Sequence, residues 1–413
     1  MSSIEHSDSA NSVDGVRLAA TAAGIKSAGE GAAPLDLLLM EFAAGSSLAA
    51  VFTQNAFCAA PVHLARQHLS SLQQAAAAEP VYCLINAGNA NAGTGRQGAR
   101  DALSCCQSVA DVMACGAEQV LPFSTGVIGE PLPVARIAEA VPTLQRSLSA
   151  TAWPEAAAAI MTTDTVAKQF HREIDIDGQH LRLSGICKGA GMIRPNMATM
   201  LAYVTTDAAI APVHLDALLR AAVAKSFNRI TVDGDTSTND ACLLVATGQS
   251  PLSLSPQHAE WAHFVAELQS LFIEMATAII RDAEGASKFI TLDVRGGRYS
   301  EECLQVGYAV AESPLVKTAF FASDANWGRI LAAIGRAGVE GLDVDSVTID
   351  LGDVRICEGG GRAASYSEEQ GAAAMAAKEI VVTIDLARGD CRERLLTSDL
   401  SLDYVHINAD YRS

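Results

Sequence analysis

The stretch from Cys187 to Asp207 constrains this 413-residue chain most, because it joins an irregular glycine segment to an apolar run. It reads CKGAGMIRPNMATMLAYVTTD, and the glycines that follow Lys188 allow tight backbone turns beside a ligand. Pro195 fixes its own φ and favours an extended conformation in the residue before it. The residues from Thr199 to Thr206 are apolar and β-branched, which predicts a buried strand. Thr199 therefore stands where a loop enters a strand.

Two interpretations of Thr199 follow from the residues alone. In the first, a β-branched threonine simply begins a core strand. In the second, the protein cuts its own Ala198–Thr199 bond, and Thr199 becomes an N-terminal nucleophile whose hydroxyl is activated by its own α-amine. An α-amine titrates near pH ~8, so much of it can act as a base at neutral pH. The chain has no obvious serine–histidine elbow that would supply a nucleophile elsewhere.

The run from Lys188 to Leu201 (KGAGMIRPNMATML) resembles the processing-site motif of the ornithine acetyltransferase family, the glutamate N-acetyltransferases of arginine biosynthesis. Further motifs extend the resemblance over essentially everything after residue 16. It implies an α/β enzyme with mixed sheets flanked by helices, in which self-cleavage generates two interleaved halves. We expect a disordered tail over residues 1–15, a first half over 16–198, and a second half over 199–413 that begins with the nucleophile.

Composition excludes several classes of protein. Hydrophobic residues make up 49% of the chain and charged residues 18%, which is typical of a well-buried globular protein. The formal net charge of -18 argues against a nucleic-acid partner, because a polyanion needs a basic surface. No apolar run in the sequence reaches membrane-spanning length, and the first fifteen residues lack the features of a signal peptide. We therefore expect a cytoplasmic protein that binds neither nucleic acid nor a membrane.

The cysteines and histidines predict neither a metal site nor a disulfide framework. The ten cysteines form no CxxC pair, which favours buried thiols in a reducing compartment. The nine histidines form no HExxH or other ligand spacing, so we expect no metal and no resident cofactor. Cys187 adjoins Lys188 and is the candidate for a thiol with a lowered pKa, although a nucleophilic role is not favoured.

A GxGxxG pattern occupies Gly93 to Gly98 between a predicted strand at residues 81–85 and a predicted helix at 101–115. We reject a dinucleotide site on two grounds. Seven residues separate the predicted strand from Gly93, which is too many for the tight turn that such a site needs. The next predicted strand ends in Ser124 rather than in a ribose-binding acid. The resemblance implies instead an Asn-rich loop that shapes the backbone near the active site.

Thr125 and Gly126 lie where the predicted strand ending at Ser124 turns at a glycine. They could form a plain turn. They could also present a hydroxyl and a backbone N–H to a developing oxyanion, each donor lowering the transition-state free energy by about 3 kcal/mol. The resemblance implies the second interpretation, in which Thr125 and Gly126 form the oxyanion hole.

Further substrate-binding residues are implied by the resemblance. The segment from Met161 to Thr165 surrounds an acid with three threonines, which is typical of capping and turn chemistry. The family motif assigns Thr162 to substrate contact. It also gives Lys188, a point charge, the role of pairing with the substrate α-carboxylate.

Glu284 closes a predicted helix over residues 259–283, just before a glycine. A carboxylate is disfavoured at a helix C-terminus, so its presence is a mild sign of function. The resemblance implies that Glu284 binds the substrate amino group and that Asn408 and Ser413 also contact substrate. The residues from Tyr404 to Ile407 are strand-like and predict a chain end tucked into the structure.

The segment from Arg229 to Asp240 predicts a strand that passes into a polar loop. Asp233, Asp235, Asn239 and Asp240 resemble a calcium loop in composition, but the terminal bidentate glutamate is missing. We interpret the loop as a hydrogen-bonded wall of the active site, as the family match suggests.

The activity that the resemblance implies is transfer of the acetyl group of N-acetylornithine to glutamate. Thr199 would carry the acetyl group as an ester between the two substrates, in an oligomer of the two cleaved halves. The sequence does not decide whether acetyl-CoA is a further donor. Two alternatives stay open: a self-processing aminopeptidase or amidohydrolase with the same threonine chemistry, and a non-catalytic N-acetylamino-acid binding protein.

Overall fold

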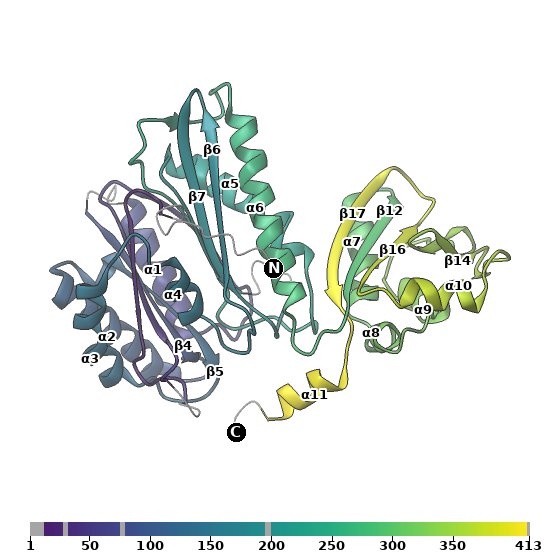
Figure 1. Cartoon of the computed structure of the whole chain (residues 1–413), viewed down its shortest axis with the longest axis horizontal. Helices are drawn as coiled ribbons and strands as arrows, with labels where there is room; N and C mark the ends of the chain where they lie inside the picture. Colours follow the sequence, from purple (N-terminus) through teal and green to yellow (C-terminus); the bar gives the residue numbers. More distant parts are fainter. Residues whose placement is uncertain (1–11, 28–31, 75–78, 195–199, 411–413) are drawn as a thin grey trace. The chain divides into compact units, whose positions relative to one another are not determined.

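The computed structural model describes residues 12–27, 32–74, 79–194 and 200–410. The chain divides into two compact units (Figure 1). The first comprises residues 1–189, 196–228 and 236–275, and the second comprises 190–195, 229–235 and 276–413. Val13, three residues before the expected boundary at residue 16, is fully buried. The predicted α/β class with mixed sheets is confirmed.

A four-stranded sheet with the order β1-β2-β4-β5 forms one part of the first unit. Its strands are β1 (Val16–Thr21), β2 (Leu37–Phe42), β4 (Val81–Asn89) and β5 (Val120–Val127). Helices α1 (Ala60–Gln74) and α4 (Trp153–Ala159) share a core with one face of the sheet, and α2 (Gly95–Met113) and α3 (Val134–Ser147) share a core with the other. Because both faces are covered, β2 is apolar along most of its length, with Leu38 on one face and Leu39 on the other.

A five-stranded sheet with the order β3-β10-β8-β7-β6 forms the other part of the first unit. Its strands are β3 (Ser47–Phe52), β6 (Lys168–Ile176), β7 (Gln179–Lys188), β8 (Leu201–Thr206) and β10 (Ala241–Ala246). Strand β10 pairs antiparallel with β3 and parallel with β8. Strands β3, β6 and β7 precede the predicted cleavage position, and β8 and β10 follow it. The sheet is therefore built from both predicted halves.

The hairpin of β6 and β7 turns at Asp177 and Gly178, as the sequence predicts. Both residues have positive φ, 52° for Asp177 and 73° for Gly178. Two consecutive positive φ angles are typical of a type I′ turn, whose twist matches that of the flanking strands. The turn therefore fixes the register that brings Lys188 to the end of β7.

Helices α5 (Pro212–Ala224) and α6 (Trp261–Arg281) accompany the five-stranded sheet. Arg172 of β6 makes ion pairs with Glu267 and Glu274 of α6, at 3.0 Å and 2.9 Å. Within the described residues, α6 is the one helix that is long and apolar enough to cross a membrane by length and composition. Its apolar face is buried, including Phe264 and Phe272, as in a core helix. Shorter elements of this unit are 3-10 turns at Ala117–Gln119 and Phe227–Arg229 and a ribbon of β9 (Ala209–Ile210) with β11 (Ser253–Leu254).

The second unit is built on a six-stranded sheet with the order β15-β14-β13-β16-β12-β17. Its strands are β12 (Phe289–Gly297), β13 (Thr348–Leu351), β14 (Val354–Glu358), β15 (Gly361–Arg362), β16 (Glu379–Asp385) and β17 (Cys391–Ser398). Strand β12 pairs parallel with β16 and antiparallel with β17. The unit also contains a 3-10 turn at Val344–Ser346 and five helices, α7 (Ser300–Ala311), α8 (Pro314–Phe321), α9 (Trp327–Gly335), α10 (Glu368–Met375) and α11 (Leu402–Ala409). The sheet shares its core with α7 to α10.

Two predicted strands are wrong. The segment after Arg229 forms only an isolated bridge at Ile230, because the N–H of Thr231 bonds to Leu396 and the N–H of Val232 bonds to Ile193. Ile193 belongs to no strand, so the segment has a strand neighbour on one side only, and the pairing there is limited to a single bridge with Leu396.

The residues from Tyr404 to Ile407 lie in helix α11 rather than in a strand. The Ser401 hydroxyl caps the helix by accepting a hydrogen bond from the N–H of Tyr404. This local cap outweighs the strand preference of the β-branched residues.

The turn at Gly178 gives a direct test of the hairpin. Gly178→Ala places a side chain at positive φ without any steric clash, because no atom lies within 4 Å of the added β-carbon. We expect the free energy of unfolding in urea to fall by about 1 kcal/mol. Gly335→Ala is the matched control, since Gly335 is helical and equally unobstructed, and alanine there should be neutral or stabilising. Equal effects of the two substitutions would contradict the turn assignment.

Candidate functional site

Gly126 lies near the end of β5, where only glycine fits. Its φ is 131°, and an added β-carbon would lie 2.3 Å from the carbonyl carbon of Gly88 and 2.6 Å from the nitrogen of Asn89. The pairing of β4 with β5 shifts register at this point. The two backbones therefore approach closely beside Thr125, which is 9% exposed. Glycine permits this close approach because it has no β-carbon.

Lys188 and Thr125 come together although 63 positions separate them in the sequence. The Nζ of Lys188, the last residue of β7, donates a hydrogen bond to the Oγ1 of Thr125 at 3.1 Å. A cation and a hydroxyl thus lie at the point where β5 reaches the glycine turn. This pair can attract a carboxylate and can stabilise negative charge that develops on an oxygen atom.

Asp164 holds the residues around Lys188 together. Its sequence context, an acid among threonines, predicts only turn and capping chemistry. Its Oδ1 accepts hydrogen bonds from the Nζ of Lys168 and the N–H of Gly189, both at 2.7 Å. Its Oδ2 accepts from the N–H of Thr162 at 3.1 Å. The carboxylate therefore ties the Thr162 segment to the residue after Lys188, and both sides of its ion pair with Lys168 are buried.

Charge keeps Asp164 ionised in this buried position. Burial alone would raise its pKa, but the positive charges of Lys188 and Lys168, with the hydrogen bonds from Lys168 and Gly189, lower the pKa below its usual value. Lys26 is a half-buried cation of this unit, and its Nζ donates to the carbonyls of Leu35 and Ala159 at 2.7 Å and 3.3 Å. Burial lowers the pKa of Lys26, Lys188 lowers it further, and Asp164 opposes the shift.

An asparagine network shapes the backbone beside Thr125, as the Asn-rich loop predicts. The Ser124 hydroxyl donates to the Oδ1 of Asn86 at 2.6 Å, and the Nδ2 of Asn86 donates to the carbonyl of Asn89 at 2.8 Å. The Oδ1 of Asn89 accepts from the N–H of Asn91 at 2.8 Å, and the Nδ2 of Asn91 reaches the carbonyl of Gly98 at 2.9 Å. All three asparagines are buried. Each side chain thus satisfies backbone groups that the irregular chain leaves without ladder partners.

The spacing argument against a dinucleotide site is wrong, although the second argument holds. Strand β4 runs to Asn89, so only residues 90–92 separate it from Gly93. The first turn of α2 is instead filled by the protein's own side chains. An added β-carbon on Gly98 would lie 1.9 Å from the Oγ1 of Thr94. Strand β5 ends at Val127 rather than at Ser124, and this end residue, where a ribose-binding acid would be needed, is again not an acid.

Asp240 is a second buried carboxyl group. The sequence gives it no role apart from that of the polar loop in which it lies. It is 3% exposed, and its Oδ2 has no hydrogen-bond partner among the described residues. Burial raises the pKa of Asp240 well above its usual value, and the opposing effects of Ser237 and Lys188 are smaller. Asp240 also precedes Ala241, whose N–H donates to the carbonyl of Met200 at 3.0 Å.

Glu284 and Asn408 are brought together within the second unit. Glu284 is 8% exposed, and its Oε2 accepts a hydrogen bond from the Nδ2 of Asn408 at 2.7 Å. Helix α6 ends at Arg281, so Glu284 lies in the turn beyond the helix rather than in its last turn. Gly191 makes room for the carboxyl group, because an added β-carbon would lie 2.3 Å from its Oε2.

The segment from Ala190 to Arg194, which leads to the predicted cleavage position, is anchored on the second unit. Asp233 accepts hydrogen bonds from the N–H groups of Met192 and Ile193, at 2.6 Å and 3.0 Å. Arg194 pairs with Glu312 at 2.9 Å. The loop that was predicted to be an active-site wall therefore holds this segment in place through Asp233.

The predicted site residues thus form two groups, one in each unit. Thr125, Gly126, Thr162 and Lys188 gather in the first unit, and Glu284 and Asn408 in the second. Ala198, Thr199 and Ser413 lie outside the described residues. The expectation of a lowered thiol pKa at Cys187 is wrong, because complete burial raises the pKa of that thiol.

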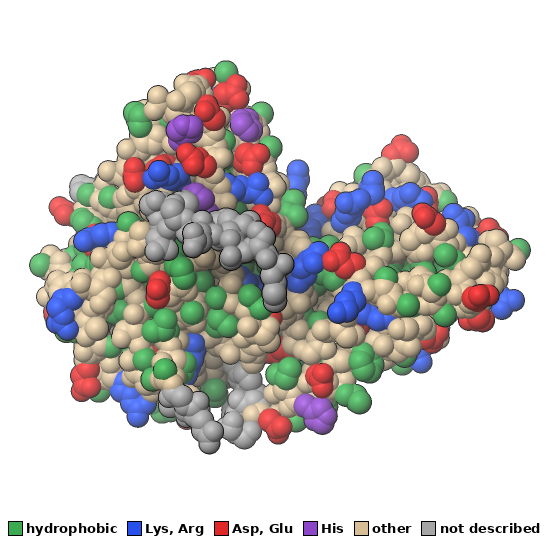
Figure 2. All heavy atoms as spheres, in the orientation of Figure 1, with side chains coloured by type: hydrophobic (Ala, Val, Ile, Leu, Met, Phe, Trp, Pro, Cys, Tyr) green, Lys and Arg blue, Asp and Glu red, His purple; other side chains and the backbone are tan. Residues whose placement is uncertain are grey.

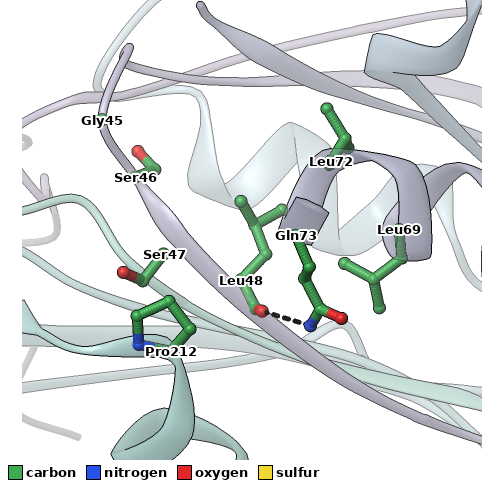
Figure 3. Close-up of a pocket in the computed structure, with 8 residues that line it drawn as sticks. All are labelled: Gly45, Ser46, Ser47, Leu48, Leu69, Leu72, Gln73 and Pro212. Atoms are coloured by element: carbon green, nitrogen blue, oxygen red, sulfur yellow. Dashed lines mark hydrogen bonds between the residues drawn. The ribbon is translucent and has the colours of Figure 1, made fainter. Parts of the chain in front are cut away.

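A separate cavity of about 220 Å³ lies in the first unit (Figure 3). It is lined by Gly45, Ser46, Ser47, Leu48, Leu69, Leu72, Gln73 and Pro212. The Nε2 of Gln73 donates to the carbonyl of Leu48 at 3.2 Å across it. The lining contains no charged side chain, so it does not suit an amino-acid substrate, and none of the predicted site residues takes part in it.

Comparisons with known proteins all find the same family. The chain matches the ArgJ family over residues 17–413. It is 52% identical to the arginine biosynthesis bifunctional protein ArgJ of Pseudomonas syringae pv. tomato over 404 residues, 97% of each chain. It is 50% identical to the protein of the same name from Psychrobacter arcticus over 403 residues, again 97% of each chain.

Solved structures are similar over about half of the chain. A crystal structure of the bifunctional protein ArgJ from Bacillus halodurans is 39% identical, covers 50% of this chain and 97% of its own, and has a TM-score of 0.48. A structure of ornithine acetyltransferase from Mycobacterium tuberculosis, complexed with ornithine, is 32% identical, covers 46% of this chain and 95% of its own, and has a TM-score of 0.38.

The buried Asp240 carboxyl predicts a pH-dependent stability. Its pKa is raised in the folded state, so above pH 3.8 the unfolded chain loses the proton that the folded chain retains. This stabilisation is complete below that pH and is lost as the pH rises towards the folded pKa. Asp240→Asn cannot titrate, so we expect its melting temperature relative to wild type to be higher at pH 7 than at pH 4. Asp353→Asn, in an exposed turn, is the control, and parallel pH profiles for Asp240→Asn and wild type would contradict the assignment.

Proposed function

This chain belongs to the ArgJ family, and we propose that it transfers acetyl groups through Thr199 of its second half. It is an arginine-biosynthesis enzyme that moves the acetyl group of N-acetylornithine to glutamate and forms ornithine and N-acetylglutamate. The observation that carries this conclusion is the match over residues 17–413, with relatives about half identical over 97% of the chain. The family also implies that the chain cleaves itself between Ala198 and Thr199.

The proposed reaction begins when the Thr199 hydroxyl attacks the acetyl carbonyl, with its own α-amine taking the proton. The Thr125 hydroxyl and the Gly126 N–H stabilise the negative oxygen of the tetrahedral intermediate. The amide bond then breaks, and ornithine leaves with the proton. The amine of glutamate attacks the resulting ester, and Thr199 is regenerated.

Each group of site residues, taken by itself, offers a partner for one kind of substrate charge. The contact of Lys188 with Thr125 supports a role for Lys188 in pairing with the substrate carboxylate, since it brings a cation to the oxyanion residues. Thr162 adjoins them through Asp164. Glu284 and Asn408 form a hydrogen-bonded pair suited to a free amino group, and we propose that Ser413 joins them.

Other parts of the proposal concern the cellular setting. The word bifunctional in the names of the relatives supports acetyl-CoA as a further donor. We propose that the reaction needs no metal or organic cofactor, and that the enzyme acts in the cytoplasm as an oligomer of paired halves.

Acidic and basic side chains are interspersed on the face shown in Figure 2, with no large field of one sign there.

The decisive experiment isolates the acetylated enzyme. Purified protein should run as two fragments of 198 and 413 − 198 = 215 residues, the second beginning with Thr199. Incubation with N-acetylornithine alone should release about one ornithine per site and leave one acetyl group on that fragment, because the ester has no acceptor amine. Glutamate should then remove the acetyl group faster than water does.

The Thr199→Ala variant controls for both steps, since it should remain a single chain and take up no acetyl group. Acetyl transfer by a wild-type chain that stays intact would refute the role of Thr199. Removal of the acetyl group by water as fast as by glutamate would indicate a hydrolase.

Glu284 provides a test of substrate recognition. In Glu284→Gln the free amino group of N-acetylornithine loses a buried anionic partner, a change that typically costs several kcal/mol. We expect acetylation by N-acetylornithine to slow by at least about 100-fold, and self-cleavage to change much less. Glu393→Gln removes an equal charge from a pair with Arg229 in the same unit and is the control. Equal, small losses in the acetylation and cleavage steps would reduce Glu284 to a structural residue.

A further inference from the structure

Asn239 connects the polar loop before β10 to the strand that carries the proposed oxyanion residues. Its side chain is 5% exposed. The Nδ2 donates one hydrogen bond to the carbonyl of Ala90 at 2.6 Å and another to the carbonyl of Ser124 at 2.9 Å. The Oδ1 accepts from the hydroxyl of Thr238. A primary amide has two N–H donors, and both are used on the backbone beside Thr125.

The contact with Ser124 bears directly on the orientation of Thr125. The carbonyl of Ser124 and the N–H of Thr125 belong to one planar peptide unit, so a bond that fixes the carbonyl also fixes that plane. Strand β5 is the last strand of its sheet as the described residues form it. A last strand has backbone groups without a neighbouring strand, and the Asn239 amide supplies a partner for one of them.

Asn239 also belongs to a different half of the chain from Ser124. Position 239 follows the predicted cleavage position, and positions 90 and 124 precede it. The amide therefore links the half that begins with Thr199 to the half that contains Thr125 and Gly126. Nothing in the reaction as proposed above uses this contact.

We infer that Asn239 is a positioning residue that holds Thr125 and Gly126 in the geometry needed to stabilise the oxyanion. The inference rests on the proposed function, because it requires the acetyl carbonyl to react beside these two residues. Asn239 acts through the Ser124 peptide and does not touch the substrate itself. Its loss should therefore slow both half-reactions, since each passes through a tetrahedral oxyanion.

Asn239→Asp is the sharpest test, because it keeps the shape of the side chain and replaces the two donors by a carboxylate. Two backbone carbonyls would then face an acceptor instead of a donor. We expect acetylation by N-acetylornithine and deacetylation by glutamate, measured per cleaved site, each to slow by about 10- to 100-fold. The dissociation constant of ornithine, which has no acetyl carbonyl, should change by less than about threefold.

A spectroscopic measurement separates positioning from general stability. The infrared stretch of a ¹³C-labelled acetyl ester on Thr199 reports how strongly hydrogen bonds polarise its carbonyl. We expect this band to move to higher frequency in Asn239→Asp, and in Asn239→Ser to a smaller extent, since serine keeps one donor. If Asn239→Asp does not cleave itself, the same measurements can be made on Asn239→Ser.

Asn55→Asp is the matched control. The Nδ2 of Asn55 donates to the carbonyl of Thr236 at 2.9 Å, so it joins the same loop to the first half without reaching β5. Asn55→Asp should keep the wild-type band and transfer rates within about threefold. Wild-type rates and band position in a cleaved Asn239 variant would overturn the inference, as would equal effects at Asn55. A wild-type enzyme that forms no acetyl ester would instead refute the proposed function itself.

Discussion

The buried carboxylate of Asp164 is the interaction on which the site in the first unit depends. It accepts hydrogen bonds from Thr162 and Lys168, which flank it in the sequence, and from Gly189, which lies 25 positions away. Charges removed from water are costly, and this one is balanced by cations and by two backbone donors. Removing one partner of such a pair typically costs about 3–5 kcal/mol, because the other charge stays buried. The end of β7, and with it the Lys188 ammonium, is therefore held firmly.

Strand β5, which carries Thr125 and Gly126, is held by a different kind of interaction, namely close backbone packing. At Gly126 the strand approaches β4 so closely that no side chain fits. Strands at such a shift in register lose regular ladder bonds, and the buried asparagines replace them. Neutral hydrogen bonds of this kind fix the backbone geometry without adding a charge beside Thr125. Electrostatic interactions thus hold Lys188 in place, whereas close backbone packing holds Thr125 and Gly126.

The sequence predicted the elements whose signals are local. Asp177 and Gly178 predict a hairpin turn. The glycine at position 126 predicts a bend in the backbone, and all three residues have positive φ. The resemblance supplied Lys188, Glu284 and Asn408, and the structure then revealed their neighbours. The contact of Lys188 with Thr125 could not be predicted from spacing, because it depends on how two sheets pack.

The wrong predictions share a physical cause. Tyr404 to Ile407 favour a strand by propensity, yet the Ser401 cap and the local turn decide for a helix. Thr231 and Val232 have the composition of strand residues, but the Val232 amide bonds to Ile193, which belongs to no strand. Asp164 has the sequence context of a turn residue, because its partner Gly189, 25 positions away, becomes its neighbour only after folding. In each case a specific hydrogen bond overrides the residue propensities: a local one at Ser401, and tertiary ones at Val232 and Gly189.

The five-stranded sheet contains strands from both halves of the chain, and this affects how the cleaved enzyme can refold. Strands β3 and β7 of one half make backbone ladders with β10 and β8 of the other. The uncut chain folds in a unimolecular reaction, but after the cut the same ladders must form between two molecules. Refolding then becomes a second-order process whose yield falls on dilution. Cleavage would thus convert a reversible fold into one that, once lost, is recovered only at high concentration.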